Sequence, residues 1–374
     1  MRMDELKLQW EAMEAGIAAQ AAYLSDGAAR ELFAAADDLP LQRPSRIYLV
    51  GCGDSHYAGL ATRYAFERWT GIATEALEIL EFSRYAIEAA PSDALVVAVS
   101  NSGRVARTIE CVVFAERRGI STLGITYDPR SRLASEARMT LPWSYDDVGF
   151  GPGTLSYLAS LVTLYAVALR IGRISGRISD DDASETLDRI GAAGAAVAAT
   201  TRDADPVAAQ LAEELTPEGL LTIIGGGPNY ATALFGMAKF IESARHPAVG
   251  QELEEWAHEQ YFCTGPGTHT VVIAPRGSSL ERAREQLRAV RDVGGRAIAI
   301  CAPDDAATSE LADLTLPAHD TGDELLSPLV TALPLELSAL RFARRLGRTM
   351  LGFDDENRRA VNFRQIFDSV IPEA

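Results

Sequence analysis

The chain has 374 residues, of which 47% are apolar and 23% charged, and its formal net charge is −17. This length suits two domains better than one core, and this composition excludes a disordered chain. The acidity, without any basic segment, argues against nucleic-acid and anionic-membrane partners, because both need a positive footprint. We expect no such partner, no membrane-spanning helix and a cytoplasmic location.

The cysteine spacing predicts reduced thiols. Cys52, Cys111, Cys263 and Cys301 form no CxxC pair, and no histidines stand beside them at the spacing of a metal site. Unpaired, mostly buried cysteines are typical of cytosolic proteins. The sequence also lacks a Gly-Lys-Ser/Thr phosphate loop and a complete dinucleotide fingerprint. We therefore expect neither a metal nor a cofactor.

The first half of the chain predicts alternating helices and strands. One or two amphipathic helices are expected over residues 6–33. Strands and helices then alternate over 46–50, 58–69, 94–99, 105–118 and 122–126. Short apolar runs of this kind are typical of strands that are buried on both faces. The β-α-β-α-β order therefore predicts an α/β domain with a mainly parallel sheet flanked by helices.

The same pattern recurs in the second half, which indicates an internal duplication. Strands are predicted at residues 220–224, 271–274 and 296–301. Three glycines follow the first, and Pro-Arg-Gly-Ser-Ser follows the second. We match residues 51–53 with 225–227 and residues 100–103 with 275–278. The expected divisions are an N-terminal helical segment 1–35, a first domain 36–175, a helical linker 176–205, a second domain 206–345 and a tail 346–374.

Two polar turns of the first half are candidate anion sites. The first holds Gly51, Cys52, Gly53, Asp54 and Ser55. Glycine permits close backbone approach there, and the following helix N-terminus attracts an anion. Many α/β proteins nevertheless use such glycines only to make the turn.

The second turn is more specific, because Ser100, Asn101 and Ser102 stand together between a strand and a helix. Ligands of open parallel sheets bind at this end of the strands. The side chains and backbone N–H groups of Ser100, Asn101 and Ser102 can surround a phosphate there. A helix N-cap needs only one such residue, so three together favour a ligand.

Residues 51–55 and 99–103 resemble the two signatures of the SIS (sugar isomerase) domain. The resemblance extends from about Ser45 to the C-terminus and implies two SIS domains, each a flavodoxin-like three-layer sandwich. Similar tandem-SIS enzymes are the isomerase part of glucosamine-6-phosphate synthase and the fructosamine-6-phosphate deglycases. Residues 227–230 and 324–344 look more like the deglycase branch.

The resemblance also implies a catalytic set. The synthase motif has a lysine, a glutamate three residues later and a histidine sixteen beyond it, which here are Lys239, Glu242 and His258. Glu242 would move a proton between adjacent sugar carbons, Lys239 would stabilise the developing oxygen charge, and His258 would shuttle the ring-opening proton. Such a histidine comes from the neighbouring subunit, which implies a homodimer with a shared site. The residues alone allow Lys239–Glu242 to be a surface ion pair.

Several positions depart from the family. Asp54 and Val105 stand where threonines are usual, and a carboxylate beside a dianion is repulsive. Arg104 is a candidate to compensate, and Thr154 a candidate for a further substrate contact. The family's C-terminal lysine is missing, so imine chemistry through that residue is not expected. We also expect no use of glutamine, since no glutaminase segment is present.

The resemblance implies that a small anionic sugar is the substrate, in amino-sugar metabolism. An aldose–ketose isomerase acting by enolisation is the first hypothesis. A deglycase or an amino-sugar-phosphate deaminase would use the same carboxylate to expel an amine. A non-catalytic carbohydrate sensor and an enzyme for an anion other than phosphate remain further alternatives.

Overall fold

The computed structural model of the protein describes residues 3–372, which form two compact units. The first-half unit contains residues 26–146 and 156–191, together with the described chain from Asp355 onward. The second-half unit contains residues 147–155 and 192–354, together with the first helix. Each unit has its own sheet and core, so each is described by itself.

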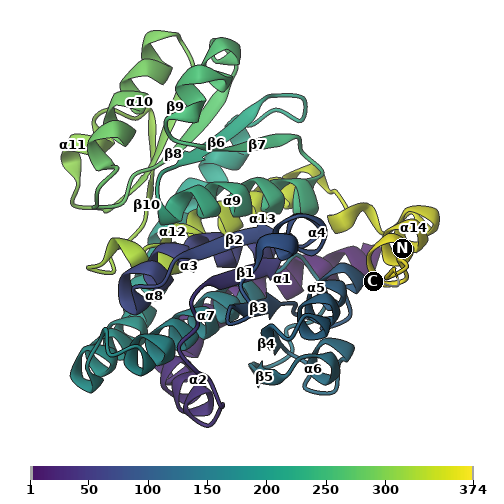
Figure 1. Cartoon of the computed structure of the whole chain (residues 1–374). Helices are drawn as coiled ribbons and strands as arrows, with labels where there is room; N and C mark the ends of the chain where they lie inside the picture. The colour runs from purple at the N-terminus through teal and green to yellow at the C-terminus, as the bar shows by residue number, and fades with distance from the viewer. Residues whose placement is uncertain (1–2, 373–374) are drawn as a thin grey trace. The chain divides into compact units, whose positions relative to one another are not determined.

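A five-stranded parallel sheet forms the centre of the first-half unit, in the order β2-β1-β3-β4-β5 (Figure 1). Every residue of β1 and β3 is buried, as expected for apolar parallel strands covered on both faces. The order 2-1-3-4-5 is that of flavodoxin-like folds. The strands are β1 Ile47–Gly51, β2 Thr74–Glu78, β3 Leu95–Val99, β4 Ser121–Thr126 and β5 Met139–Pro142.

The second-half unit repeats this sheet, with strands in the order β7-β6-β8-β9-β10 and every pair parallel. The strands are β6 Leu221–Gly225, β7 Ala248–Glu252, β8 His269–Ile273, β9 Arg296–Cys301 and β10 Leu314–Pro317. Helices flank both sheets, which confirms the predicted α/β class with two mainly parallel sheets.

The helices follow the strands along the chain. In the first-half unit they are α2 Ala28–Asp37, α3 Asp54–Thr70, α4 Ile79–Arg84, η1 Ala86–Ala89, α5 Ala106–Arg117, α6 Arg132–Glu136, α7 Leu155–Ile174 and α14 Glu356–Phe367. In the second-half unit they are α1 Met3–Ser25, α9 Pro228–Ala244, η2 Glu255–His258, η3 Gln260–Cys263, α10 Leu280–Asp292, α11 Ala306–Ser309, η4 Glu324–Leu326, α12 Pro328–Thr331, α13 Leu333–Leu346 and η5 Met350–Gly352. The long helix α8, Asp180–Glu214, contributes to both units.

The backbone confirms the duplication and corrects one of its correspondences. Gly53 and Gly227 share the same unusual conformation, with φ 55° in both and ψ −131° and −129°. The N–H of Ser100 donates to a carbonyl of β4, and the N–H of Ala274 donates to the matching carbonyl of β9. Ser100 therefore matches Ala274, one residue earlier than we predicted from the sequence.

The outer strands of both sheets escaped the sequence analysis. β2 and β7 are mostly half-buried, and their sequences mix polar with apolar residues. β5 and β10 are only four residues long. An edge strand is covered less completely than a central one, so no continuous apolar run marks it.

The C-terminal segment follows the second domain in sequence, but the described chain from Asp355 onward folds with the first-half unit. Arg107 donates through Nη2 to the carbonyl of Val370 at 2.7 Å, and Ile371 packs against the first-half core. Phe367 lies under the Arg104 guanidinium, 4.8 Å from the ring centre. Packing against the first-half unit removes the apolar side chains of Phe367 and Ile371 from water, which favours this position of the segment.

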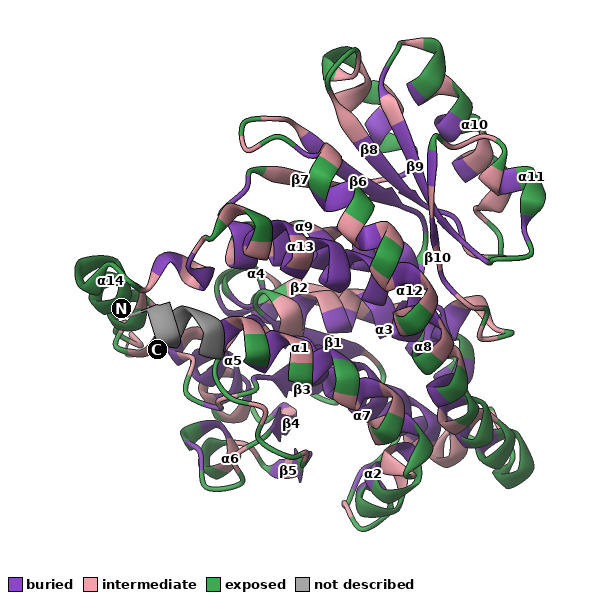
Figure 2. Ribbon diagram, turned by 180° about the vertical axis from the view of Figure 1, so that it is seen from behind, coloured by how far each residue is buried: buried purple, intermediate pink, exposed green. Residues whose placement is uncertain are grey.

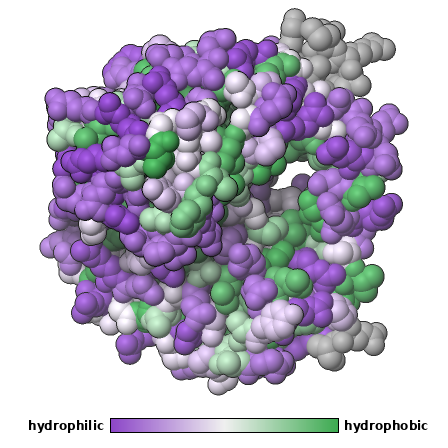
Figure 3. Space-filling view, turned by 90° about the horizontal axis from the view of Figure 1, so that it is seen from above, coloured by the Kyte–Doolittle hydropathy of each residue, from purple (hydrophilic) through white to green (hydrophobic). Residues whose placement is uncertain are grey.

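Two helical stretches are long and apolar enough to cross a membrane by length and composition, contrary to our expectation. They are Leu155–Ile174 and Glu324–Leu346, and 89% and 94% of their apolar windows are buried inside the protein. Figure 2 shows both stretches largely in the colour of buried residues. Core helices of folded proteins pass the same test, so the finding is weak evidence for a membrane span. Hydrophilic side chains predominate on the face in Figure 3.

Candidate functional site

The serine-rich turn of the first half lies between the end of β3 and the start of α5. Ser100 is only 3% exposed, yet its Oγ has no hydrogen-bond partner among the described residues. Val105 stands at the N-cap of α5 and provides no side-chain cap. A buried hydroxyl without a partner is costly, and an uncapped helix N-terminus presents free N–H groups. This turn therefore offers donors to an anion.

Asn101 is fixed in this turn from two sides. Its carbonyl accepts from the N–H of Tyr127 at 3.0 Å and from Oγ1 of Thr126 at 3.2 Å. Its side-chain Oδ1 accepts from the hydroxyl of Tyr145 at 3.1 Å. The rings of Tyr127 and Tyr145 lie 4.9 Å apart beside it. No sequence pattern marks these two tyrosines, because they lie in a segment without a recognisable motif.

Ser102 and Arg104 make different contacts from those expected of an anion-binding pair. The N–H of Arg104 donates to Ser102 Oγ at 3.3 Å, and its guanidinium stacks on Phe367. Between them Gly103 has φ 60°, and a Cβ there would lie 2.1 Å from Ser131 Oγ. Only glycine fits this position, so the turn's shape depends on it.

The glycine-rich turn begins where β1 meets α3. A Cβ on Gly51 would lie 2.8 Å from the backbone carbon of Ser55, so the strand end and the helix start are in close contact. Cys52 and Gly53 are exposed, and Gly53 caps α3 without a side chain. Asp54 is the first helical residue, where an acidic side chain is favourable to the helix dipole. This favourable interaction with the helix dipole explains why an aspartate stands at position 54, without any contact to a ligand.

His56, at the start of α3, is a further candidate that no sequence motif marks. It is 6% exposed, its Nδ1 lacks a partner among the described residues, and its Nε2 lies 3.4 Å from Glu78 Oε1. Burial lowers the pKa of His56, although the Glu78 carboxylate and the Leu77 backbone partly raise it. A neutral imidazole beside the glycine-rich turn could accept or donate one proton. His56 becomes a candidate site residue only because it is buried, and burial could not be predicted from the sequence.

Lys239 and Glu242 lie together on α9 in the second-half unit. Nζ of Lys239 donates to Glu242 Oε2 at 2.6 Å and to the carbonyl of Gly153 at 3.0 Å, and it lies 4.7 Å from the centre of the Phe235 ring. The lysine side chain is completely buried, whereas that of Glu242 is 31% exposed. A buried ammonium requires such partners. The alternative of an ordinary surface ion pair is therefore wrong for Lys239.

Thr154 follows the carbonyl that binds Lys239. It is 3% exposed, and its Oγ1 would lie 2.3 Å from a Cβ placed on Gly16 of α1. The hydroxyl thus packs against the first helix. This contact gives Thr154 a structural role in holding residues 147–155 beside α1.

His258 ends the short helix η2 and is not joined to the Lys239–Glu242 pair by any recorded contact in the described chain. Its side chain is 69% exposed, and Nε2 lies 3.7 Å from Glu254 Oε1. Glu255 is exposed as well, and its N–H donates to Glu252 Oε2 at 3.1 Å. Both side chains therefore face solvent in the single chain.

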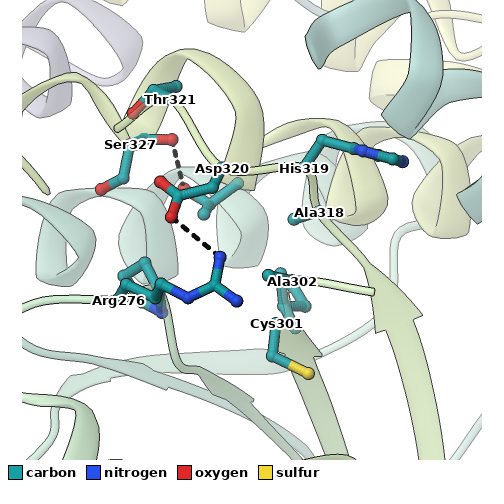
Figure 4. A pocket seen from close by; sticks show the side chains of 11 residues that line it. Arg276, Cys301, Ala302, Ala318, His319, Asp320, Thr321 and Ser327 are labelled. Carbon is teal, nitrogen blue, oxygen red and sulfur yellow. Dashed lines mark hydrogen bonds and ion pairs between the residues drawn. The ribbon is translucent and has the colours of Figure 1, made fainter. Parts of the chain in front are cut away.

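A small, partly open hollow lies at the carboxyl ends of β9 and β10 in the second-half unit (Figure 4). Arg276 reaches across it to Asp320 at 3.1 Å and also binds Asp304 at 2.8 Å. The lining consists of Pro275, Arg276, Ile300, Cys301, Ala302, Ala318, His319, Asp320, Thr321, Ser327 and Thr331. Its charged groups already pair with each other.

The titratable residues offer no recognisable metal site within residues 3–372, where no three His, Cys, Asp or Glu side chains converge. Cys52 and Cys263 are exposed free thiols, and Cys111 and Cys301 are buried. Burial, with a smaller effect of Asp305, raises the pKa of Cys301 to about 12. That thiol stays protonated at neutral pH and is a poor nucleophile.

Comparison with known proteins identifies the family. Residues 41–170 and 214–344 each match the SIS domain. Glutamine–fructose-6-phosphate aminotransferase [isomerizing] of Gloeobacter violaceus is 30% identical over 303 residues, which are 81% of this chain and 49% of that protein. The same-named protein of Streptomyces coelicolor is 29% identical over 313 residues, 82% of this chain and 50% of its own. The chain thus spans about half the length of these relatives.

Solved structures agree with this fold. The C-terminal domain of glucosamine-fructose-6-phosphate aminotransferase from Francisella tularensis has a TM-score of 0.79 at 20% identity, over 91% of this chain and 98% of that chain. Tagatose-6-phosphate ketose/aldose isomerase from Escherichia coli has a TM-score of 0.73 at 18% identity, over 91% of this chain and 94% of its own. Both domain matches lie within one chain, and together they cover most of it. The protein therefore belongs to the SIS domain family and carries two of its domains.

Proposed function

We propose that this protein is an aldose–ketose isomerase that acts on a sugar phosphate or amino-sugar phosphate by enolisation. The family and its isomerising relatives support a phosphosugar substrate. We further propose a cytoplasmic homodimer in which His258 from a second copy of the chain completes the site. The exposure of His258 in the single chain is consistent with such a role.

The observation that carries this proposal is the buried ammonium of Lys239 beside a partly exposed carboxylate. Nζ of Lys239 holds Glu242 Oε2 at 2.6 Å, and a backbone carbonyl holds Nζ from the other side. Ordering and desolvating a lysine is costly, so a surface position would be cheaper for stability alone. The 31% exposure of Glu242 leaves its carboxylate accessible to a substrate.

The chemistry needs one proton carrier and one positive charge. The Glu242 carboxylate takes the proton from C2 of the aldose, and the C–H electrons form a C1–C2 double bond while O1 becomes an oxyanion. The ammonium of Lys239 stabilises that charge. Glu242 then returns the proton to C1, and the hydroxyl proton of O2 passes to O1. One carbon is reduced and its neighbour oxidised, so no external oxidant is required.

The serine-rich turn is the proposed site for the anionic end of the sugar. Ser100 Oγ, Ser102 Oγ and the N–H groups at the start of α5 supply donors without a full positive charge. Arg104 stacks on Phe367, so this proposal does not require its guanidinium.

Solvent deuterium exchange tests the enolisation step directly. Wild-type protein is incubated in D2O with a panel of aldose and ketose phosphates, amino-sugar phosphates, fructosamine adducts and sulfonated sugars, and deuterium at C1 or C2 is followed by NMR. Exchange is expected with at least one sugar phosphate, and Glu242→Gln should abolish it while binding persists. Glu285→Gln, an exposed carboxylate on α10, is the matched control.

Each outcome assigns a function. Exchange with interconversion of aldose and ketose supports the isomerase. Exchange with release of ammonia or an amine would replace it by a deaminase or deglycase. Exchange that survives Glu242→Gln would remove Glu242 from the mechanism, and binding of sugars without any exchange would make the protein a sensor.

A further inference from the structure

The serine-rich turn has a counterpart in the second half, and a carboxylate of the chain itself fills it. The N–H of Ser278 donates to Glu324 Oε2 at 2.9 Å. A Cβ placed on Gly277 would lie 2.2 Å from Glu324 Cδ and 2.4 Å and 2.5 Å from its two oxygens. The carboxylate therefore rests directly on the backbone of this turn, where a side chain at Gly277 would displace it.

The two turns correspond residue by residue. The N–H of Ile109 donates to Val105 in α5, and that of Ala283 donates to Ser279 in α10 at the same place in the repeat. Gly103 therefore matches Gly277. The amide that donates to Ser102 Oγ in the first half thus has its equivalent in the Ser278 amide, which donates to Glu324.

The two turns differ in what they leave open. In the first half Ser100 Oγ is buried without a partner among the described residues, and the Arg104 amide donates to the Ser102 hydroxyl, not to a carboxylate. In the second half the position of Ser100 holds Ala274, which has no hydroxyl to satisfy. The Ser100 hydroxyl of the first turn thus lacks a partner among the described residues, whereas Glu324 supplies the second turn with a carboxylate.

Glu324 is held in place through its backbone. Its carbonyl accepts from Ser327 Oγ at 2.7 Å, and Ser327 Oγ accepts from Asn229 Nδ2 at 2.8 Å. Asn229 is completely buried near the start of α9, and its Oδ1 accepts from Thr331 Oγ1 at 2.6 Å. This network fixes the segment that carries Glu324, so the carboxylate is presented to the turn with little freedom.

The charges around the second turn oppose a free dianion. Arg276 is the cation nearest the turn in sequence, and it already binds Asp304 and Asp320. With Glu324 in place, three carboxylates accompany one guanidinium. If the Glu324 side chain were removed, Asp304 and Asp320 would still balance Arg276, so a small monoanion would be accommodated better than phosphate.

We propose that Glu324 is a built-in anion that closes the oxyanion turn of the second half, and that this turn accepts a free monocarboxylate such as formate or acetate once the side chain is truncated. The intact chain consequently has one open anion turn, in the first half. This last statement rests on the proposed function, whereas the closure by Glu324 does not.

Chemical rescue of Glu324→Ala tests the closure. Melting temperatures are measured in chloride, formate and acetate at equal ionic strength. In chloride, Glu324→Ala should melt about 2–6 °C below wild type, because the Ser278 amide loses a charged acceptor. Formate should recover much of this difference, since a ligand that binds only the folded state stabilises it. Wild type and Glu281→Ala, which removes an exposed carboxylate from the first turn of α10, should show no selective response.

Two further measurements keep the test decisive. Glu324→Gln should resist rescue, because its amide still fills the space. If Glu324→Ala does not fold in chloride, its refolding yield in formate is the readout, and a higher yield supports the proposal. Equal behaviour of Glu324→Ala in all three salts would overturn it.

Phosphate titration of wild type then separates this inference from the proposed function. One phosphate per chain, lost in a Ser100→Ala/Ser102→Ala double variant, supports the single open turn. Two phosphates per chain would overturn the closure. Formate rescue without any phosphate binding would uphold the closure and remove the phosphosugar assignment.

Discussion

Nζ of Lys239 lies 2.6 Å from Glu242 Oε2, and the lysine side chain is completely buried while the glutamate side chain is 31% exposed. Water can therefore reach the Glu242 side chain but not the Lys239 side chain. Without Lys239, the carboxylate of Glu242 can be hydrated, whereas without Glu242 the buried ammonium of Lys239 loses its charged partner. Because of this difference, truncating Glu242 and truncating Lys239 should lower the free energy of unfolding by different amounts.

We predict that Glu242→Ala lowers the free energy of unfolding by about 2–4 kcal/mol, because a buried ammonium loses its counter-ion. Lys239→Met should cost about 1 kcal/mol or less, since an apolar side chain of similar length suits the site beside Phe235. Denaturant unfolding of the single variants and of the double variant measures both terms. Equal costs for the two single variants would contradict the expected difference, while both variants should lose turnover.

Ser100→Ala should separate binding from stability. The hydroxyl has no partner among the described residues, so its removal should leave the free energy of unfolding within about 0.5 kcal/mol of wild type or slightly higher. Affinity for the anionic sugar should fall about tenfold, the effect of one lost hydrogen bond to a charged group. Isothermal titration measures the affinity. Ser135→Ala, at an exposed serine of α6, is the control, and unchanged affinity in Ser100→Ala would place the anion elsewhere.

Gly103→Ala should be more harmful than Gly119→Ala. Both glycines have positive φ, 60° and 76°, and this backbone conformation costs a side chain about 1–2 kcal/mol. A Cβ at Gly103 would also meet Ser131 Oγ at 2.1 Å, whereas one at Gly119 would meet nothing within 4 Å. We expect a difference of about 1–3 kcal/mol between the variants. Thermal unfolding checks this, and equal costs would mean that the turn adjusts freely.

His246 should make the protein less stable in mild acid. Burial lowers its pKa from 6.5, with smaller opposing effects of the Pro217 carbonyl and Glu218 and a lowering by Arg348 and His269. The folded state therefore favours the neutral imidazole. Stability from this group is present above pH 6.5 and is lost as the pH falls through the lower folded-state pKa, because the unfolded chain binds the proton more readily.

The measurement is the slope of the free energy of unfolding between pH 7 and pH 5. One histidine contributes at most about 1.4 kcal/mol per pH unit. His246→Gln should reduce the slope, although its loss of packing against Phe342 lowers stability at all pH values. His319→Gln, at a partly exposed histidine paired with Asp203, provides the comparison. A slope unaffected by His246→Gln would assign the acid sensitivity to other groups.

The predicted strands and helices of each sheet centre match the structure closely, since buried parallel strands are continuous apolar runs. The outer strands β2 and β7 were missed, because half-buried residues carry no such run. The match of Ser100 with Ala274 also needed the structure. The predicted match of residues 51–53 with 225–227 was correct, whereas the match of the serine-rich turn was one residue out of register. Only the hydrogen bonds between strands fix that register.

The sequence by itself determined the α/β class, the duplication, the two turns and the placement of Lys239 and Glu242 three residues apart on one helix. These follow from local periodicity and from residue types at the ends of strands. The tertiary structure decided which polar groups have partners. The Gly153 carbonyl reaches Lys239 across 86 residues, Tyr145 reaches Asn101 across 44, and Glu324 reaches Ser278 across 46. Burial and pairing depend on long-range packing, which no local pattern encodes.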